Sequence, residues 1–434
     1  MSPVTIGLIG IGVLLLAFLL RMPIAFAMTF VGFIGFAYLS GLGPGLSLLA
    51  RDIFTQFSSF PLSVIPMFIL MGSFAFASGI SAKLYDTAYK WIGQLRGGLT
   101  MATVLACAGF AAISGSATAT AATMGRIALP EMKKYGYDDT LATGCVAAAG
   151  SLGILIPPST VFVVYGILTE QSIGKLFIAG ILPGIILSLL FILAVALICL
   201  RNPALGPPGV PTSWKEKAGA LTGVIDTIIL FSGVMGGLFL GFFTPTQAGA
   251  VGAAGALLIG LARRKLTWRG FLEAGKDAVR TSCMVLFIIT GAIIFGRFMA
   301  VSTLTFVLAE WVDGLPLPPI AIMGVIIFMY FIGGFFMDAL ALVVLTIPIF
   351  FPIVIRLDFD PIWFGVIIVL VNNMGLVTPP VGNNVFVVKG VAEGVALETI
   401  FKGTFPFLGA MIVCTVLVVA FPQIATFLPS FITY

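Results

Sequence analysis

The sequence predicts an all-α polytopic membrane protein built from inverted structural repeats, with two re-entrant hairpins and two broken helices. Three observations support this prediction. Hydrophobic residues fill 60% of the 434 positions and charged residues only 9%, so most segments must face lipid or other apolar helices. Apolar stretches long enough to cross a bilayer, about 20 residues each, recur along the whole chain. Two of these stretches are interrupted by a similar Pro-Pro motif.

The apolar runs divide into full crossings and two longer stretches. The longer stretches, 98–130 and 319–353, each carry a polar or glycine-rich break near the middle. We interpret each as a hairpin that enters and leaves the membrane on the same side. The runs that fit full crossings are 4–20, 23–40, 61–80, 140–168, 176–200, 219–242, 246–262, 281–308, 362–388 and 403–429. The first run lacks a basic start and an Ala-x-Ala end, so we expect a retained helix rather than a cleaved signal.

The distribution of basic residues supports the two hairpins. Cytoplasmic loops of membrane proteins are enriched in Lys and Arg. When neither hairpin is counted as a crossing, one face collects most of the 22 Lys and Arg residues, and the other face holds only Arg51, Lys175 and Arg356. Counting a hairpin as a crossing would move the downstream loops to the other side and blur this asymmetry. The resulting topology places both termini on the face that is poor in basic residues.

Three connecting segments have distinctive compositions. Segments 81–97 and 263–280 combine basic residues with a tryptophan, which is typical of short amphipathic helices at the cytoplasmic interface. Such helices either anchor at the lipid surface through snorkelling side chains or connect moving parts, and the sequence leaves both open. The run RNPALGPPGVP at 201–211 is the most evident linker and separates two halves of the chain.

The two Pro-Pro motifs share one pattern. They read GILIPP at 153–158 and GLVTPP at 375–380, each inside an apolar run. Proline lacks an N–H and clashes with the carbonyl four residues back, so the motifs should free the carbonyls of Gly153 and Gly375 and of the residue after each. At membrane depth a free carbonyl needs protein, water or an ion to satisfy it. The motifs are therefore candidate cation sites, whereas a lone proline would more often be a plain kink satisfied by neighbouring side chains.

The spacing between hairpins and motifs is the same in both halves. Counting back 41 residues from Pro157 reaches Ser116, and counting back 41 from Pro379 reaches Asp338. Both residues lie at the polar break of a hairpin. The predicted topology opens the two hairpins to opposite faces, so the copies are inverted. Inverted repeats with broken helices are found in many secondary transporters, whose binding site lies at the repeat interface.

The residues that are absent argue against an enzyme. The chain has no histidine, which excludes Ser-His-Asp catalysis, His-ligated metal sites and histidine proton relays. Its five cysteines are scattered singly in apolar segments, without the paired spacings of metal or redox sites.

Two charged residues, Arg297 and Asp338, lie inside apolar stretches. A charged group at that depth is costly unless paired, so a functional role is the first hypothesis. The planar guanidinium of Arg297 suits a substrate carboxylate. The structural alternative is an ion pair between Arg297 and Asp338 that holds helices together.

Four segments, SGSATATAATMGRIALPEM, GSLGILIPPS, FTPTQAGAVGA and LVTPPVGNN, occur in this order and resemble the large membrane (M) subunit of the tripartite ATP-independent periplasmic (TRAP) transporters. The resemblance covers essentially the whole chain. It implies an elevator-type transporter in the bacterial inner membrane, with both termini periplasmic and a transport domain that slides against a scaffold. It also implies sodium ions as the coupling ion, a small membrane subunit, and a periplasmic substrate-binding protein that delivers an organic acid.

The resemblance also assigns site residues. It implies one sodium site at Ser114, Gly153, Ile156 and Pro158, a second at Gly334, Gly375, Thr378 and Val381, and a substrate region at Ser114, Ser116, Arg297 and Asp338. Two positions depart from the family pattern. Gln247 stands where the family usually has an acidic residue, and Asn383 stands where a hydrophobic residue is expected.

These expectations combine into a domain plan and a function. The predicted function is sodium-coupled import of an organic acid, such as a C4-dicarboxylate, a sialic acid or another sugar acid. The alternatives are a stand-alone divalent-anion/sodium symporter, whose Ser-Asn-Thr hairpin tips are absent here, a membrane-embedded enzyme, and a purely structural membrane subunit.

The predicted parts are scaffold helices with an interfacial arm at 1–97, the first hairpin and broken helix at 98–168, scaffold helices at 169–318 with linker 201–217, arm 263–280 and the Arg297 helix, the second hairpin and broken helix at 319–388, and a C-terminal helix at 389–434.

Overall fold

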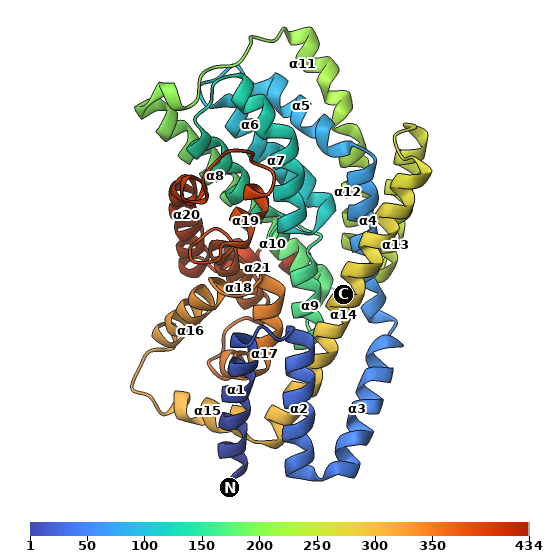
Figure 1. Cartoon of the computed structure of the whole chain (residues 1–434), viewed down its shortest axis with the longest axis vertical. Helices are drawn as coiled ribbons and strands as arrows, with labels where there is room; N and C mark the ends of the chain where they lie inside the picture. The colour runs from blue at the N-terminus through green and yellow to red at the C-terminus, as the bar shows by residue number, and fades with distance from the viewer. Residues whose placement is uncertain (433–434) are drawn as a thin grey trace.

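The computed structural model describes residues 1–432, which are helical throughout their regular structure and include no strand. The last two residues of the predicted C-terminal segment 389–434 lie outside the described residues. Among the described residues, five helices are long and apolar enough to cross a membrane, or up to seven if each bent pair is one span. Figure 1 shows an elongated bundle with the N-terminus at one end.

The helices differ widely in length, and several predicted crossings are divided into shorter pieces. Four-residue α21 lies near the C-terminal end. The α-helices are α1 Pro3–Leu19, α2 Ile24–Ser40, α3 Leu42–Phe57, α4 Val64–Ala77, α5 Ile80–Ile92, α6 Gly98–Ser114, α7 Ala117–Lys134, α8 Asp139–Gly150, α9 Thr160–Thr169, α10 Ile173–Arg201, α11 Trp214–Ala220, α12 Ile225–Phe239, α13 Pro245–Ala262, α14 Trp268–Val301, α15 Leu304–Asp313, α16 Pro319–Gly334, α17 Ala339–Arg356, α18 Pro361–Gly375, α19 Asn383–Lys389, α20 Leu397–Ala420 and α21 Gln423–Thr426.

Helices α2, α4, α13 and α14 pack closely, and we call them the α2/α4/α13/α14 block. Small residues bring their backbones together. A methyl group on Gly32 would lie 2.7 Å from the Phe295 backbone, and one on Gly291 would lie 2.6 Å from the Ala25 carbonyl oxygen. Membrane helices commonly associate through such small-residue contacts, because apolar side chains gain little from leaving lipid. The contacts fix α14 firmly against α2.

Residues 98–134 and 319–356 each fold as two helices joined by a short turn, as the sequence predicts. The polar residues at the turns cap the second helix of each pair. Ser116 Oγ accepts the Ala119 N–H of α7 at 3.3 Å, and Asp338 Oδ1 accepts the Leu340 N–H of α17 at 3.0 Å. A capping oxygen satisfies N–H groups that a new helix leaves without partners. The polar breaks in the sequence are thus helix starts.

Both Pro-Pro motifs interrupt a helix, as predicted. In the first half, α8 passes into a short 3-10 turn at Ser151–Ile154, and α9 begins only at Thr160. In the second half, α18 ends at Gly375 and α19 begins at Asn383. Both Pro-Pro peptide bonds are cis. Each half therefore contains a helix pair followed by a broken helix, in the same order.

The second predicted arm, 263–280, is not a separate element, and this prediction is wrong. Helix α14 begins at Trp268 and continues without a break to Val301, so it includes the Arg297 segment. The element that follows α14 after a turn at Thr303 is α15, just as α5 follows α4 after a turn at Gly79. The first arm, 81–97, corresponds to α5. The charges of 263–280 belong to a long helix, several of whose polar residues line the cavity described below.

The linker does not hang free but lies against the end of α5. The Gly97 N–H donates to the Gly206 carbonyl at 2.8 Å, and the Gly209 N–H donates to the Gly93 carbonyl at 2.9 Å. Backbone groups of the linker thus find partners as they would in a regular element. The linker is fastened to the junction between α5 and α6.

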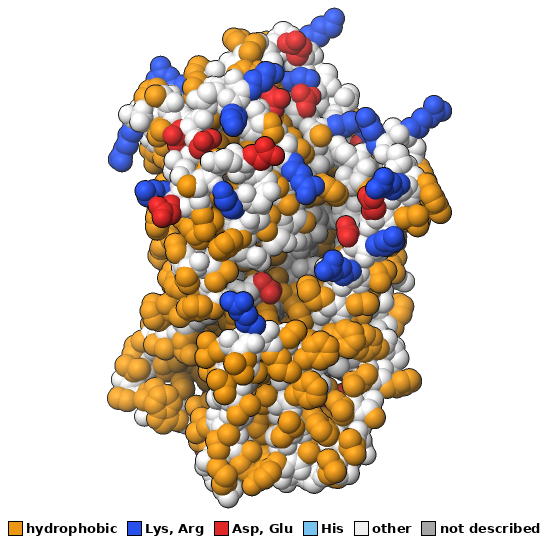
Figure 2. All heavy atoms as spheres, viewed as in Figure 1, with side chains coloured by type: hydrophobic (Ala, Val, Ile, Leu, Met, Phe, Trp, Pro, Cys, Tyr) orange, Lys and Arg blue, Asp and Glu red, His pale blue; other side chains and the backbone are white. Residues whose placement is uncertain are grey.

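Charged side chains concentrate at one end of the molecule. On the face shown in Figure 2, Lys and Arg gather with most Asp and Glu over the end that carries α5 and α11, while the opposite part is almost wholly hydrophobic. This asymmetry agrees with the uneven distribution of basic residues in the sequence. We call the charged part the basic end.

Candidate functional site

A cavity of about 890 Å³ lies where the two hairpins and the two broken helices meet α4 and α14. Ser114 and Ser116 line it from the first hairpin, and Asp338 lines it from the second. Ile154 and Asn383 line it from the two breaks. The lining continues to the start of α14 at the basic end. One space thus unites the elements whose spacing is repeated in the sequence, as is typical of transporter binding sites.

The tip of the first hairpin rests on the first break. A methyl group on Gly153 would overlap the Ser116 carbonyl oxygen, and one on Gly115 would lie 2.8 Å from the Pro158 carbonyl oxygen. The Thr160 hydroxyl donates to the Gly115 carbonyl at 3.2 Å. Glycine is required where two backbones approach this closely. The contact places Ser116, predicted for the substrate region, beside Gly153 and Pro158, which are predicted for the first sodium site.

Hydroxyl and carbonyl oxygens cluster behind this tip. Ser114 Oγ lies 2.9 Å from Thr120 Oγ1, which also donates to the Ser116 carbonyl at 2.8 Å. Ser114 is buried. Ile156 faces the other way, because its side chain packs where a methyl group on Gly184 of α10 would meet it at 2.6 Å. Only the main chain of Ile156 can therefore serve a site here.

The second hairpin meets the second break in a similar way. A methyl group on Gly375 would lie 2.5 Å from the Gly334 carbonyl oxygen. The Thr378 hydroxyl is buried and donates to the Met374 carbonyl at 2.6 Å. Val381 lies in the loop before α19 with its side chain exposed. The structure thus places Gly334 and Gly375 in contact, with Thr378 one turn beyond.

Some of the carbonyls that lose their helical hydrogen bond to the prolines accept a hydrogen bond from another group of the protein. The Ser159 hydroxyl donates to the Ile154 carbonyl at 2.6 Å, and the Asn384 N–H donates to the Leu376 carbonyl at 3.0 Å. The prediction that these two carbonyls are bare is therefore wrong. The sequence shows where a helix breaks, but it does not show that a donor only five or eight residues further along the chain folds back onto the carbonyl.

Buried amide groups near the second break were missed in the sequence. The side-chain oxygens of Asn372, Asn373 and Asn384, and the nitrogen of Asn373, are buried without a hydrogen-bond partner among the described residues. Nearly all buried polar atoms in folded proteins have a partner in protein, water or an ion. The available signal was the Asn-Asn pair inside the apolar run that ends at Gly375.

The two departures from the family pattern have different surroundings. Gln247 completes a capping box at the start of α13, where its Oε1 accepts the Thr244 N–H at 2.9 Å. A glutamate would make the same contact, so glutamine preserves this helix start. Asn383 lines the cavity as the first residue of α19. A polar side chain thus stands at the cavity wall where the family pattern has a hydrophobic one.

The structure corrects the predicted role of Arg297. Its Nε donates to Asp52 Oδ2 at 3.0 Å and its Nη2 to Asp52 Oδ1 at 3.4 Å, so its partner is Asp52 of α3 and not Asp338. Arg297 lines a shallow apolar groove beside Phe36 and Leu48, apart from the cavity that holds Ser114, Ser116 and Asp338. The sequence concealed this pair because Asp52 lies 245 positions away and was assigned to an outer loop.

Removing Arg297 is expected to destabilise the protein rather than weaken substrate affinity. The Asp52 side chain is 4% exposed, so Arg297→Met would leave a buried carboxylate without its partner, at a cost of about 2 kcal/mol. Adding Asp52→Asn to Arg297→Met should restore most of the loss. Thermal unfolding of the purified variants measures both effects. A higher KM for uptake in Arg297→Met, with no loss of thermal stability, would show that Arg297 binds substrate after all.

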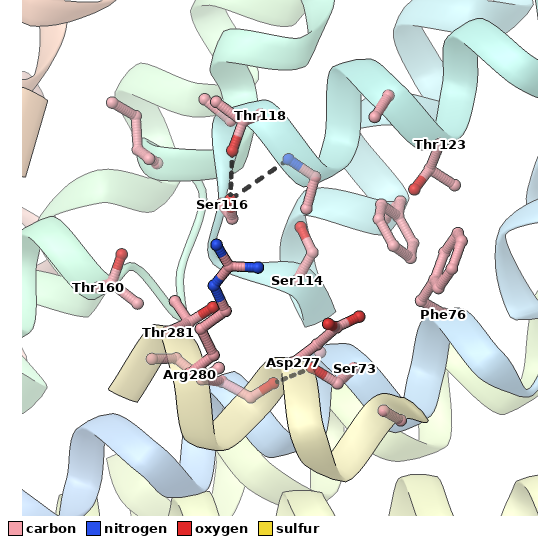
Figure 3. A pocket seen from close by; sticks show the side chains of 18 of the residues that line it. Ser73, Phe76, Ser114, Ser116, Thr118, Thr123, Thr160, Asp277, Arg280 and Thr281 are labelled. Atoms are coloured by element: carbon pink, nitrogen blue, oxygen red, sulfur yellow. Dashed lines mark hydrogen bonds between the residues drawn. The ribbon is translucent and has the colours of Figure 1, made fainter. Parts of the chain in front are cut away.

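Sequence reasoning assigned Arg280 to an interfacial arm, but the structure directs it into the cavity. Arg280 lies on α14, and its side chain reaches toward Ser116 at the tip of the first hairpin (Figure 3). Asp277 and Thr281 of the same helix also line the cavity. The sequence does not show in which direction a charged side chain points. Because the predicted arm ended at residue 280, the helical periodicity that would have shown a polar face along α14 was interrupted.

Comparison with known proteins identifies a family. Residues 11–424 match the family described as "Tripartite ATP-independent periplasmic transporter, DctM component". The chain is 37% identical over 391 residues to the C4-dicarboxylate TRAP transporter large permease protein DctM of Pseudomonas aeruginosa, covering 88% of this chain and 90% of that protein. It is 31% identical over 410 residues to the sialic acid TRAP transporter large permease protein SiaM of Vibrio cholerae, covering 94% and 95%.

Further matches concern a longer relative and two solved structures. The isethionate TRAP transporter permease protein DctMQ of Oleidesulfovibrio alaskensis is 37% identical over 393 residues, which cover 88% of this chain and 60% of that protein. The YdaH transporter of Alcanivorax borkumensis has a TM-score of 0.62 at 16% identity, covering 88% of this chain and 89% of that one. MtrF of Neisseria gonorrhoeae has a TM-score of 0.61 at 14% identity, covering 98% and 95%. At these identities the two structures show similarity of fold alone.

Proposed function

Because the chain belongs to the tripartite ATP-independent periplasmic (TRAP) transporter family, as its large membrane subunit, we propose that it imports an organic acid together with sodium ions. The family consists of multi-pass membrane transport proteins and not of enzymes. The observation that carries the proposal is the single cavity lined by both hairpin tips and both broken helices. In secondary transporters such a site lies between the repeats.

The substrate is an acid with a carboxylate or sulfonate group. Relatives are named for C4-dicarboxylates, for sialic acid and for isethionate. Each of these compounds carries at least one carboxylate or sulfonate group. Ser114, Ser116 and Asp338 line the cavity. The serine hydroxyls can donate hydrogen bonds to the acid group, and the Asp338 carboxylate can accept them from substrate hydroxyl groups. Its volume, about 890 Å³, suits a molecule as large as a sugar acid.

Two sodium ions bind where hairpin tips meet broken helices. Sodium prefers oxygen donors, and a helix break supplies carbonyls at membrane depth. The support is the oxygen cluster at the first tip and the partnerless amide oxygens near the second break. The proposed ligands are Ser114, Gly153, Ile156 and Pro158 for one ion, and Gly334, Gly375, Thr378 and Val381 for the other.

Transport proceeds by an elevator motion of the two hairpins and broken helices against the α2/α4/α13/α14 block. The cavity lies between these two groups, so their relative displacement would carry its contents across the membrane. Glycines at the start of α5 and at the start of α6 support the idea. Gly79 and Gly97 have φ of 74° and 71°, and Gly79 has open space around it. Such positions can absorb the backbone change of a hinge.

The subunit works in the bacterial inner membrane with a small membrane subunit and a periplasmic substrate-binding protein. The longer isethionate relative carries a name that joins two components, DctMQ, and this chain covers 60% of it. By the positive-inside rule the basic end faces the cytoplasm, and the N-terminus, which lies at the opposite end (Figure 1), is then periplasmic. The proposed topology places the C-terminus on the periplasmic side as well. Because the cavity lining continues to the start of α14 at the basic end, the cavity would then open toward the cytoplasm.

The test is uptake into proteoliposomes that contain all three components. Labelled succinate, N-acetylneuraminate and isethionate are offered with an inward sodium gradient or with potassium in its place. We expect uptake of at least one acid only with sodium. Thr378→Val removes one proposed oxygen ligand and should raise the sodium concentration for half-maximal uptake about tenfold, which corresponds to roughly 1.4 kcal/mol of binding free energy.

The control is Thr415→Val on α20. The Thr415 hydroxyl is also buried and also donates to the carbonyl four residues earlier, at 3.0 Å, but it lies outside the breaks. This variant should keep the sodium response of the unmodified protein. Uptake that ignores sodium, or equal responses of the two variants, would overturn the sodium assignment. Uptake by this chain without its partners would favour a stand-alone anion/sodium symporter instead.

A further inference from the structure

Arg280 occupies an unusual place for a charged residue. It lies twelve residues after the start of α14 at Trp268 and lines the cavity rather than the outer surface. Figure 3 shows its guanidinium directed at the first hairpin tip, with Ser116 ahead of it and Ser114 close by. The tip belongs to the first hairpin, whereas α14 is fixed to α2. Arg280 therefore faces the hairpin across the boundary between the two groups of helices.

No acidic side chain neutralises Arg280 among the side chains that the structure describes, which are those of residues 1–432 without Asp313. Arg263, Arg269 and Arg297 each form an ion pair there, but Arg280 forms none. Asp277 lies one turn earlier on the same helix and lines the same cavity, yet its carboxylate is not within ion-pairing distance of Arg280. Arg280 is exposed where it lines the cavity, so its guanidinium, which has no carboxylate partner there, is accessible to an anionic ligand.

The other cations that line the cavity lie farther from the tip. Arg126 is ten residues beyond Ser116 along α7, which is about 15 Å along a helix axis at 1.5 Å per residue. Lys265 precedes the first residue of α14 and lies at the cavity's basic end. Arg280 is thus the cavity-lining cation that is directed toward Ser116 (Figure 3). Its planar fork of donors matches the two oxygens of a carboxylate, or two of a sulfonate.

We propose that Arg280 grips the anionic group of the transported acid against the Ser114 and Ser116 hydroxyls while the cavity is open to the basic end. The class of acid rests on the function proposed above, whereas the anion site itself rests on the geometry of Arg280. Because α14 stays with the α2/α4/α13/α14 block, a displacement of the hairpin separates the guanidinium from the serines. Arg280 then binds the acid in one state of the transporter only and promotes its release as the states exchange.

The first experiment measures the electrostatic potential at the tip without any transported substrate. Ala119 is exposed, lines the cavity and follows Ser116 by three residues, so Ala119→Cys makes a reporter. Cys283 is the exposed native cysteine, and Cys283→Ser removes its reaction. The purified protein is labelled with an anionic sulfonatoethyl methanethiosulfonate and, separately, with its cationic trimethylammonium counterpart. The ratio of the two rates reports the local potential.

Arg280→Gln should lower the ratio of anionic to cationic labelling about tenfold, since a nearby charge in a cavity of low effective dielectric acts strongly on a charged reagent. Arg280→Lys keeps a positive charge and should retain most of the ratio. Lys276→Gln is the matched control, because Lys276 is exposed on the same helix but does not line the cavity. It should change the ratio less than twofold. An unchanged ratio in Arg280→Gln, or an equal fall in Lys276→Gln, would overturn the proposal.

The second experiment tests whether the anion is the transported acid. Millimolar succinate, N-acetylneuraminate or isethionate should slow anionic labelling of Ala119→Cys at least threefold where Arg280 is present, and should not slow it in Arg280→Gln. A fall in the ratio without protection by any of the three acids would keep an anion site at Arg280 but overturn its role in gripping these acids. Sodium-independent uptake would refute the coupling proposed above and leave the labelling result standing, so the two failures are distinguishable.

Discussion

Gly403→Ala is expected to destabilise the protein severely. Gly403 of α20 crosses α8 so closely that an added methyl group would overlap the Thr140 carbonyl oxygen and lie 3.0 Å from the Gly144 Cα. Backbone atoms of two helices cannot step aside as a flexible side chain would. Overpacking of this kind costs about 3 kcal/mol. Thermal unfolding of the purified protein should therefore begin several degrees lower than in the unmodified protein.

Gly409→Ala provides the matched control on the same helix. A methyl group on Gly409 meets nothing within 4 Å, and alanine favours a helix over glycine by roughly 1 kcal/mol. The unfolding temperature of this variant should stay level or rise. If the two alanine variants unfold at the same temperature, the close crossing of α8 and α20 does not determine stability.

Gly153→Ala is expected to abolish most uptake while leaving the protein folded. The added methyl group would overlap the Ser116 carbonyl oxygen and lie 2.7 Å from Thr120 Oγ1, so the first hairpin tip must shift away from the break. A displacement of about 1 Å at a binding site can cost a hundredfold in rate. Sodium-driven uptake in proteoliposomes measures the effect, and thermal unfolding checks that the fold is intact.

Gly174→Ala is the comparison for that experiment. Gly174 lies in the first turn of α10, and a methyl group there would meet its nearest neighbour at an ordinary 3.7 Å. Its uptake should remain within twofold of the unmodified protein. Normal uptake by Gly153→Ala would show that the contact between tip and break is not needed for transport.

The parts of the fold that could be predicted are those with a local cause. Pro157 and Pro379 break their helices through their own chemistry, and the break follows wherever the rest of the chain lies. Ser116 and Asp338 begin helices because their side chains cap N–H groups two or three residues ahead. Such features depend on a few adjacent residues, so the sequence alone shows them.

The errors concern partners that lie far apart in the chain. Arg297 pairs with Asp52, 245 positions away, only once the helices have packed. The charges near Arg280 have the composition of a surface helix, and composition does not distinguish a water-filled cavity from the cytoplasmic interface. The sequence therefore predicted which residue types reach the site better than which individual residues do.

The fastening of the linker limits where the two halves can come apart. Its hydrogen bonds to Gly93 and Gly97 leave little slack between the end of α10 and the start of α11. A linker that is hydrogen-bonded in this way cannot extend if one half of the protein moves relative to the other. The linker, which looks like the most flexible connection in the sequence, is therefore held to the junction between α5 and α6 and is expected to move with it rather than independently.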